Sequence, residues 1–215
     1  MYPPYIELIR QLFPNAAIII DRFHIIQALN RELNRYRIHW MNKVKYQDRW
    51  LYNKLKRYWK LFLKKETELD HIHYRRFTLF DSLMNIGYIV DYLLDQNKIF
   101  KETYRMVQNL RYALEKSDEA QFMITLHQAP KQQIPPGLRR VLRTFKKFQP
   151  YISNTFAHPT ITNVSIEGIN NKIKVLKRNA YGYRNYTHFK NRILLISRLY
   201  VSGRKEKETK QQLIA

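Results

Sequence analysis

Apolar residues recur at helical spacing along most of the chain, and they predict long helices. Residues 3–13 form the first predicted helix, which two prolines open and which Pro14 and Asn15 end. A second helix is predicted after Asp21, where Ile25 and later apolar residues follow with a spacing of three to four. Glycine is scarce, with 5 residues among 215, and this scarcity also favours a mainly helical protein.

The run from Ala16 to Ile20 departs from the helical pattern because it is apolar without a break. Its β-branched residues are typical of a strand that is buried on both faces. One strand cannot make a sheet, so we expect that its partner strands are missing or that another chain supplies them. Helix, buried strand and helix together predict a piece of an α/β layer near the start of the chain.

From about Lys43 to Pro150 the pattern predicts helices throughout. Asp48 begins one of them, and the later ones cover about 77–95, about 97–116, a stretch from Ser117 to about 128, and a short basic helix over 137–148. Residues 150–162 look irregular. Two further helices are predicted over about 164–180 and 187–200, and a charged tail follows from Gly203.

The charge of the chain points to a polyanionic partner. Lys and Arg number 39 and Asp and Glu number 17, which gives a formal net charge of +22. A positive field of this strength attracts nucleic acid, although a generic basic, ribosome-associated protein would have the same composition. A membrane surface is a weaker candidate, because the basic residues are not gathered on one amphipathic helix.

Several classes of protein conflict with the sequence. Cysteine is absent, so disulfides, thiol catalysis and a thiolate zinc site are excluded within this chain. Residues 1–15 carry charges through their apolar part, unlike a secretory leader. The longest apolar run has five residues, whereas a membrane span needs about 20. We therefore expect a soluble, cytoplasmic protein without a membrane partner.

Asp21 is the first candidate for chemistry. A carboxylate at the carboxyl end of a buried strand lies where open α/β sheets place their ligands. The alternative is a helix N-cap, a position that Asp favours and that needs no further function. His24 lies one turn later and is a possible neighbour in the same site, or simply a packed or solvated residue.

Glu167 is the second candidate, because of the helix that it begins. At about 100° per residue, one stripe of this helix is apolar, and the opposite stripe carries Glu167, Asn171, Lys174 and Arg178. This order suits a metal at the head of the row and phosphates beyond it. The alternative is a solvated face on which Glu167 stabilises the first helical turn. Gly168 is unfavourable inside a helix, which suggests close approach of a backbone or ligand there.

Other chemical patterns are weaker. The Asp70-His71-Ile72-His73 run resembles a metal site, but two residues of separation do not bring both histidines onto one helix face, so we assign it to the surface. The aromatic residues around Trp50 and Trp59 suit base stacking, yet at helical spacing they are more typical of a core. The sequence has no glycine-rich phosphate loop, serine nucleophile elbow or kinase signature.

Two segments together resemble DDE transposases of the ISL-three insertion-sequence family. FPNA at 13–16 followed by IIIDRFH at 18–24 resembles the second-aspartate region of that family. IEGINNKIK at 166–174, with KR at 177–178 and AYGYRN at 180–185, is similar to the region of its third acidic residue. The resemblance covers nearly the whole chain, and the six residues between the glutamate and the second lysine of IEGINNKIK also fit a spacing common in DDE transposases.

The resemblance implies both a fold and a chemistry. The fold class would be mainly α with a short buried strand, that is, a partial RNase H-like α/β core carrying a large all-helical insertion. In such enzymes three carboxylates hold two Mg²⁺ (or Mn²⁺) ions for DNA cleavage and strand transfer. Asp21 would be the second carboxylate and Glu167 the third, with His24 as a possible neighbour. The DNA-binding residues would be Asn171, Lys172, Lys174, Lys177 and Arg178, among which Lys174 would contact a phosphate near the cut.

The same resemblance divides the chain into four parts. Residues 1–42 would be the partial core, 43–150 the helical insertion, 151–202 the C-terminal core helices with the third acidic residue, and 203–215 a flexible basic tail. The family's first aspartate lies upstream of anything present here, so we expect a truncated transposase with little activity alone.

The expected partners are DNA, as insertion-sequence ends and target, and a second copy or a full-length transposase. One alternative is a non-catalytic DNA-binding remnant that modulates a full-length transposase. Another is an unrelated helical RNA-binding protein, for which a preference for structured RNA over duplex DNA would be the sign.

Overall fold

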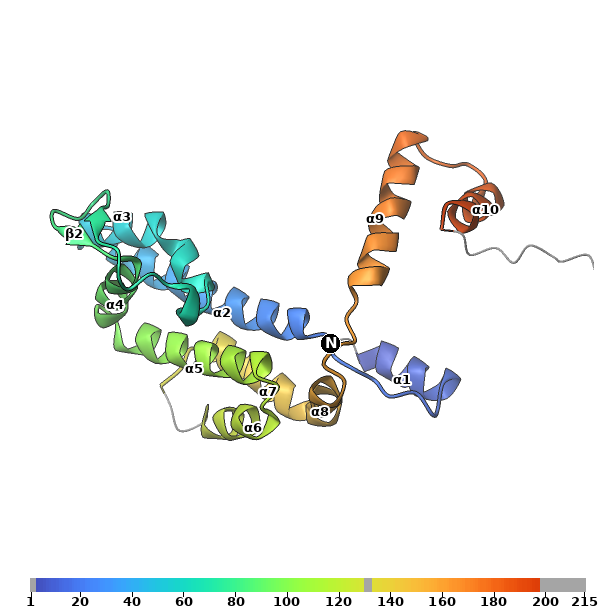
Figure 1. Cartoon of the computed structure of the whole chain (residues 1–215), viewed down its shortest axis with the longest axis horizontal. Coiled ribbons are helices and arrows are strands. Elements are labelled where there is room, and N and C mark those ends of the chain that lie inside the picture. Colours follow the sequence, from blue (N-terminus) through green and yellow to red (C-terminus); the bar gives the residue numbers. More distant parts are fainter. Residues whose placement is uncertain (1–2, 130–132, 198–215) are drawn as a thin grey trace, which may run out of the picture. The chain divides into compact units, whose positions relative to one another are not determined.

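The computed structural model describes residues 3–129 and 133–197, and their regular structure is almost entirely helical (Figure 1). The chain divides into two compact units, residues 1–161 and residues 162–215. No helix in the described ranges combines the length and the apolar character needed to cross a membrane.

The first unit is built from helices with one small hairpin. Its elements, in chain order, are α1 (Pro3–Leu12), α2 (Arg22–Val44), α3 (Arg49–Arg57), the 3₁₀ turns η1 (Trp59–Leu63) and η2 (Glu66–Glu68), the strands β1 (Arg75–Arg76) and β2 (Leu83–Met84), α4 (Ile86–Asp95), α5 (Lys98–Glu115), α6 (Glu119–Gln128), α7 (Pro136–Lys147) and α8 (Gln149–Ala157). Helix α2 contacts α3, α5 and α7, and α5 also contacts α4 and α6. The long helix α2 is therefore the centre of the packing.

Aromatic side chains join α2 to the helices that follow it. Phe100 of α5 is fully buried, and its ring lies 4.9 Å from that of Phe62 and 5.5 Å from that of Trp40 between ring centroids. Ile25, Leu29 and Leu33 of α2 belong to the same continuous core and are completely buried. The spacing of these three residues puts them on one helix face, which is why the amphipathic pattern of α2 predicts this packing.

Most of the helices expected from the sequence are present. The predictions for 3–13, 97–116, 137–148 and 164–180 agree with α1, α5, α7 and α9 (Val164–Asn179) to within one residue at each end, and the stretch predicted from Ser117 to about 128 agrees with α6 apart from a start two residues later. Side-chain caps explain several of these starts, since Asp48, Asn97 and Asp118 each accept a hydrogen bond from a backbone N–H of the helix that follows. The end of the helix predicted over 187–200 lies outside the described residues.

Two local predictions are wrong. Residues 77–85 are not helical, because β1 and β2 form an antiparallel hairpin whose Phe77 and Phe80 rings pack against Tyr58. Residues 149–157 are helical rather than irregular. Pro150 lies in the first turn of α8, where a proline loses no hydrogen bond and fixes a favourable backbone angle.

The predicted buried strand over Ala16–Ile20 is also wrong. In the described part of the chain the only sheet is the two-stranded hairpin, and residues 16–20 belong to neither strand. Their backbone is held by α8 instead, since Asn154 Nδ2 donates to the carbonyl of Ile18 (2.9 Å) and Thr155 Oγ1 donates to that of Ile20 (2.6 Å). Side chains thus satisfy carbonyl groups that a neighbouring strand would otherwise satisfy.

Thr155 offers a direct test of this arrangement. A Thr155→Val substitution keeps the side-chain shape but leaves the carbonyl of Ile20 without its donor, and Thr155 itself is buried. We expect the free energy of unfolding to fall by about 1–3 kcal/mol, as for other buried acceptors that lose their partner. Urea denaturation measures the change. Thr155→Ser keeps the hydroxyl and is the control, so an equal loss in both variants would contradict this role of the hydrogen bond.

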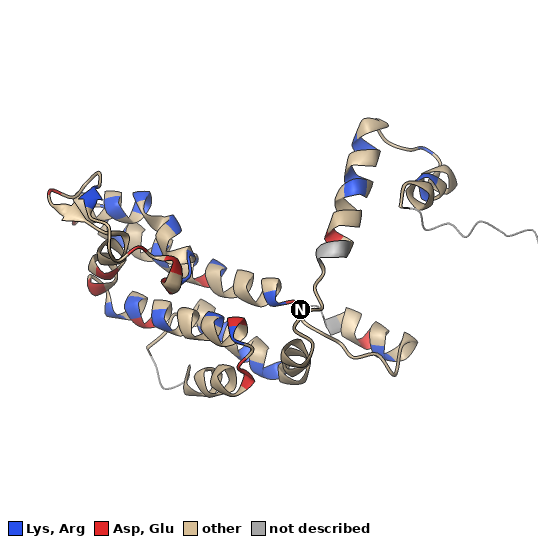
Figure 2. Cartoon of the chain, in the orientation of Figure 1, with Lys and Arg blue, Asp and Glu red and all other residues tan. Residues whose placement is uncertain are grey.

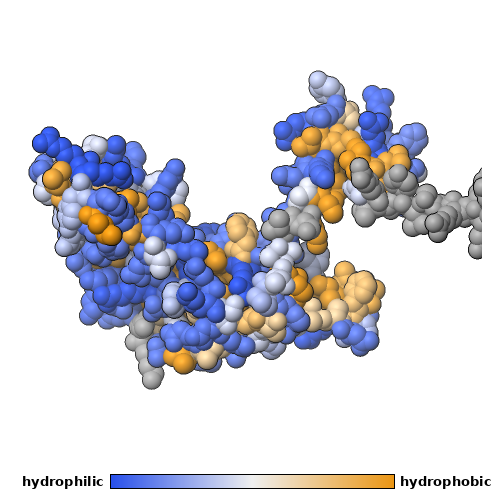
Figure 3. Space-filling view, viewed as in Figure 1, coloured by the Kyte–Doolittle hydropathy of each residue, from blue (hydrophilic) through white to orange (hydrophobic). Residues whose placement is uncertain are grey.

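The second unit consists of α9 and α10 (Tyr186–Ile196) in its described part. Gly182 has a φ of +100°, which favours glycine, and its N–H donates to the carbonyl of Lys177 to close the end of α9. The rings of Tyr183 and Phe189 lie 4.7 Å apart. None of the side chains described in this unit is buried, and hydrophobic residues remain on its surface (Figure 3). The two helices therefore have no core of their own.

Candidate functional site

Asp21 lies at the junction between the non-helical segment 16–20 and α2. It is the N-cap of α2, because its Oδ1 accepts a hydrogen bond from the N–H of Phe23 at 2.7 Å. The structure therefore shows the capping role that the sequence left open. A carboxylate has two oxygens with several acceptor positions, so capping through Oδ1 is compatible with a second role. Asp21 is half-buried, which keeps it within reach of solvent ions.

His24 lies in the first turn of α2, at the same end of the helix as Asp21. Its side chain is exposed, and its ring meets that of Phe23 edge to face, with 5.7 Å between the centroids. The structure thus favours a solvated histidine over a packed one. His24 also lines a cavity between α2 and α7, which is described below.

Glu167 lies in the first turn of α9, as the sequence predicts. The predicted faces of this helix are also confirmed: Ile169, Ile173 and Leu176 are half-buried, whereas the polar row is exposed. That row and its neighbours comprise Glu167, Asn171, Lys172, Lys174, Lys177 and Arg178. Within the described residues, no ion pair involves Glu167.

Gly168 does not have the surroundings that we expected from its position after Glu167. A Cβ atom built on Gly168 meets no atom within 4 Å, so no backbone or side chain approaches it in the structure. Open space beside the glutamate leaves room for a ligand. Nothing in the described part of the chain requires glycine at position 168.

The carboxylates proposed as metal ligands belong to different units: Asp21 to residues 1–161 and Glu167 to residues 162–215. Inside the described ranges, no group of three His, Asp or Glu side chains is placed to hold a metal ion. The individual residues nevertheless suit Mg²⁺, since both supply hard carboxylate oxygens and neither is fully buried.

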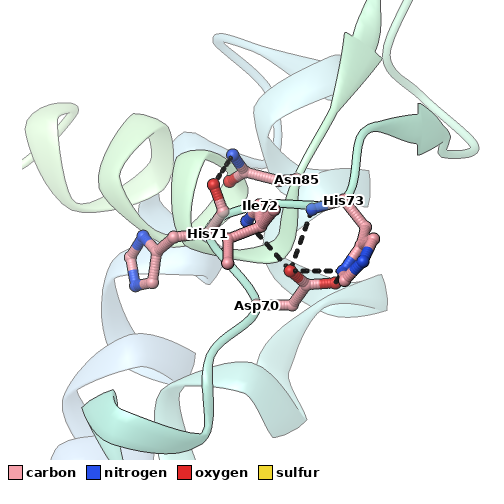
Figure 4. A network of polar contacts seen from close by, with 5 residues as sticks. All are labelled: Asp70, His71, Ile72, His73 and Asn85. Carbon is pink, nitrogen blue, oxygen red and sulfur yellow. Dashed lines mark hydrogen bonds and ion pairs between the residues drawn. The ribbon is translucent and has the colours of Figure 1, made fainter.

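The Asp70–His73 segment is a surface turn fixed to the start of α4, in agreement with the sequence (Figure 4). Asp70 Oδ1 accepts hydrogen bonds from the N–H groups of Ile72 (2.9 Å) and His73 (3.0 Å), and Oδ2 lies 3.1 Å from His73 Nδ1. The His71 carbonyl accepts from Asn85 Nδ2 at 2.8 Å. The two histidine rings therefore have different neighbours: His73 pairs with Asp70, while His71 lies against Gly87.

These contacts make the turn sensitive to acid. Hydrogen bonds from the backbone of His73 and Ile72 lower the pKa of Asp70 from 3.8 to about 2. Because the folded-state pKa is depressed, the stabilisation is present above the unfolded value and is lost as pH falls through about 2. An NMR titration is expected to find this low pKa and a concurrent shift of the His73 amide. Asp70→Asn is expected to remove that shift, and its persistence would contradict the assignment.

A cavity of about 620 Å³ lies between α2 and α7, and sequence reasoning missed it. The face of α2 supplies His24, Gln27, Ala28, Arg31, Glu32 and Arg35, and α7 supplies Gly137, Arg140, Val141, Thr144 and Phe145. Lys and Arg residues are spread over the helices of the first unit (Figure 2). Three arginines and one carboxylate thus line the same cavity of the first unit.

Glu32 organises this cavity. Its side chain is only 5% exposed, and both of its oxygens bind Arg35 Nη1, at 2.8 and 3.1 Å. Arg31 Nε lies 3.8 Å from the same carboxylate. A Cβ atom built on Gly137 would lie 2.2 Å from Glu32 Oε2, so glycine is needed for the carboxylate to approach the first turn of α7. There it meets the positive end of the helix dipole.

The fold and these residues define a basic helical protein with a half-buried carboxylate at the start of α2 and an exposed one at the start of α9. Comparison with known proteins identifies its family. The model of the ISL3 family of DDE transposases, described as "Transposase", matches residues 1–193, and the chain belongs to this family.

Two curated proteins are similar to the chain. The chain is 28% identical over 180 residues to "Transposase for insertion sequence element IS1001" of Bordetella parapertussis. This match covers 82% of this chain and 41% of that protein. The chain is also 39% identical over 107 residues to a Lactococcus lactis subsp. lactis protein named "ATP-dependent protease". This second match covers 50% of this chain and 34% of that protein. The chain thus spans less than half the length of these relatives. No solved structure matches it.

The name of the Lactococcus protein is not transferred to this chain. None of the five glycines in this chain begins the glycine-rich motif that binds ATP phosphates in P-loop proteins. The family match extends over most of the chain, whereas the match to that relative extends over half of it.

Proposed function

We propose that this chain is the later part of a DDE transposase catalytic domain, which cleaves DNA and transfers strands during transposition of an insertion sequence. The observation that carries the proposal is the family match over residues 1–193, because this range includes both Asp21 and Glu167. The formal net charge of +22 supports DNA as the partner, since DNA presents a dense row of phosphates. The core of such an enzyme would be RNase H-like, with residues 43–150 as its helical insertion and α9 among its C-terminal core helices.

Asp21 and Glu167 would hold Mg²⁺ or Mn²⁺ together with one further carboxylate. A metal bound there lowers the pKa of water or of a 3′-hydroxyl and stabilises the leaving oxygen of a phosphodiester. The third carboxylate, first in chain order, would come from a segment outside these 215 residues. The match to the Bordetella transposase, which covers 41% of that protein, supports a longer parent polypeptide.

The protein's own residues would bind and orient the DNA strand. Lys174 lies two turns after Glu167 on the exposed face of α9, and Arg178 follows one turn later. Both would contact phosphates and keep the scissile bond beside the carboxylates. Asn171 on the same face, and Lys172 and Lys177 beside it, would extend this contact along the backbone.

A second candidate function is a non-catalytic DNA-binding protein that modulates a full-length transposase. Under the proposed assignment, Asp21 and Glu167 would be two of the three carboxylates that cleavage needs, whereas the net charge of +22 suits DNA binding with or without cleavage. Such a protein would keep the basic face of α9 and would bind DNA without cutting it. It would modulate a full-length transposase by competing with it for DNA or by pairing with it.

Metal-dependent nicking separates the two candidates. The assay incubates labelled insertion-sequence ends with Mg²⁺ and either this chain or a polypeptide that also contains the segment encoded upstream of it. Under the catalytic proposal, the longer polypeptide nicks the ends, and Asp21→Asn abolishes nicking. Binding by both polypeptides without any nicking would overturn the catalytic proposal in favour of the second candidate. Stronger binding to structured RNA than to duplex DNA would count against both.

A further inference from the structure

The cavity between α2 and α7 has the charge of an anion-binding site. Three of its lining residues are arginines, and Glu32 is its one acidic residue, so two positive charges remain without an internal counter-ion. The side chains of Arg31 and Arg35 are both 64% exposed even though they contact Glu32, and Arg140 is also exposed. Each guanidinium has five N–H donors, and the contacts with Glu32 use few of them.

Glu32 holds two of these arginines in place. Because its carboxylate is buried and fixed against Gly137, the arginines that it binds are held at the cavity rather than extended into solvent. An arginine that is already oriented loses less conformational entropy when it binds a phosphate. A buried carboxylate beneath two exposed guanidiniums is therefore a positioning device.

The position of the cavity relates it to Asp21. His24, Ala28, Arg31 and Arg35 follow one another along a single face of α2, and Asp21 caps the start of that helix. A DNA strand that reached Asp21 would find this row of donors within the next turns of the same helix. The volume of about 620 Å³ is within the range of sites that enclose a small ligand, which is more than a lone ion needs.

We propose that the cavity between α2 and α7 binds the sugar–phosphate backbone of the DNA strand next to the cleavage site, with Arg31, Arg35 and Arg140 as the phosphate donors. The inference rests on the proposed function and deepens it, because it adds a DNA contact on α2 and α7 to those on α9. Glu32 is a positioning residue in this site and does not touch DNA.

The absence of cysteine makes a thiol-protection experiment clean, since an introduced cysteine is the only thiol in the full chain. Ala28→Cys places the thiol in the cavity wall. Thr67→Cys is the control, because Thr67 is exposed between Glu66 and Glu68, away from the cavity. Both variants are labelled with a maleimide in the presence of chelator, so that metal-dependent cleavage plays no part. A duplex DNA, an RNA of the same sequence and inorganic phosphate are the three probes.

The expected result is protection of the Ala28→Cys thiol alone. DNA at ten times its dissociation constant is expected to slow labelling there by about 10-fold and to leave the control thiol unchanged. Unchanged labelling at both thiols, while fluorescence anisotropy shows DNA binding, would overturn this inference and leave the proposed function standing. Failure of the full chain to bind DNA at all would overturn both. Protection by phosphate but not by DNA, or better protection by RNA, would also overturn the inference.

Arginine substitutions give an independent measurement. Replacing Arg31 and Arg140 by Ala is expected to reduce the slope of log affinity against log salt concentration by about 2, or about 1 for each lost phosphate contact. Arg139→Ala is the matched control, since it removes the same charge from the neighbouring position of α7 and does not line this cavity. An equal effect of Arg139 and Arg140 would indicate binding along the whole helix face and would contradict a site in the cavity.

Discussion

Replacing Glu167 by Gln in a longer polypeptide that contains this chain is expected to reduce metal-dependent DNA nicking by at least about 100-fold. Substitution of groups that merely support a metal ligand already costs about 10–100-fold, and loss of the ligand itself is expected to cost more. The fold is expected to remain intact, because Glu167 is exposed and takes part in no ion pair among the described residues. Nicking of labelled DNA measures the effect, and circular dichroism measures the helical content.

Glu119→Gln is the control for this experiment. Glu119 is also an acidic residue in the first turn of a helix, α6, so both substitutions remove a charge from the same kind of position. Only the Glu167 variant is expected to lose activity, and both are expected to bind DNA. Nicking that survives Glu167→Gln would show that this carboxylate holds no catalytic metal.

The largest effect on stability is expected from Phe100→Ala. The ring of Phe100 is completely buried at the start of α5, where it contacts Trp40 of α2 and Phe62 of η1. Removing it would leave a cavity where three elements meet, and we expect a loss of about 3–5 kcal/mol in the free energy of unfolding. Small proteins have about 5–15 kcal/mol in total, so this variant would lose a large share of its stability.

Tyr112→Ala is the matched control on the same helix. Tyr112 is 53% exposed, so its removal is expected to change the free energy of unfolding by no more than about 0.5 kcal/mol. Urea denaturation of the full chain compares the two. Equal, small losses in both variants would mean that the aromatic contacts of Phe100 do not hold α5 against α2.

The helices could be predicted from the sequence because their signals are local. Asp118 caps α6, and the apolar residues Ile169, Ile173 and Leu176 mark the less exposed face of α9. The hairpin after residue 74 was not predicted, since Phe77 and Phe80 have a helical spacing. Their actual partner is Tyr58, whose position depends on contacts that are distant in the sequence.

The segment 16–20 shows a different limit of sequence reasoning. Its β-branched composition favours extended backbone, but a strand also requires a neighbour that offers hydrogen bonds. Here Asn154 and Thr155 supply them from a helix more than 130 residues later. No pattern within the segment identifies which partner it receives.

One feature of the sequence does point to the cavity between α2 and α7. Glu32 lies on the same stripe of α2 as Ile25, Leu29 and Leu33, and a carboxylate on a core-facing stripe needs a buried partner. Its partners could not be fully foreseen. Arg35 is within one turn, whereas Gly137 comes from another helix, and only the fold brings that glycine against the carboxylate.

The continuity of α2 has a mechanical consequence. This helix runs for 23 residues without a break, about 34 Å at 1.5 Å per residue, from the Asp21 cap to the region that packs against α3. A rod of that length acts as a lever arm. If α2 rotated by about 5° about its C-terminal end, Asp21 at the other end would move by about 3 Å, roughly the length of a hydrogen bond. A partner that pressed on the distant helices and tilted α2 would thereby move a carboxylate that it does not touch.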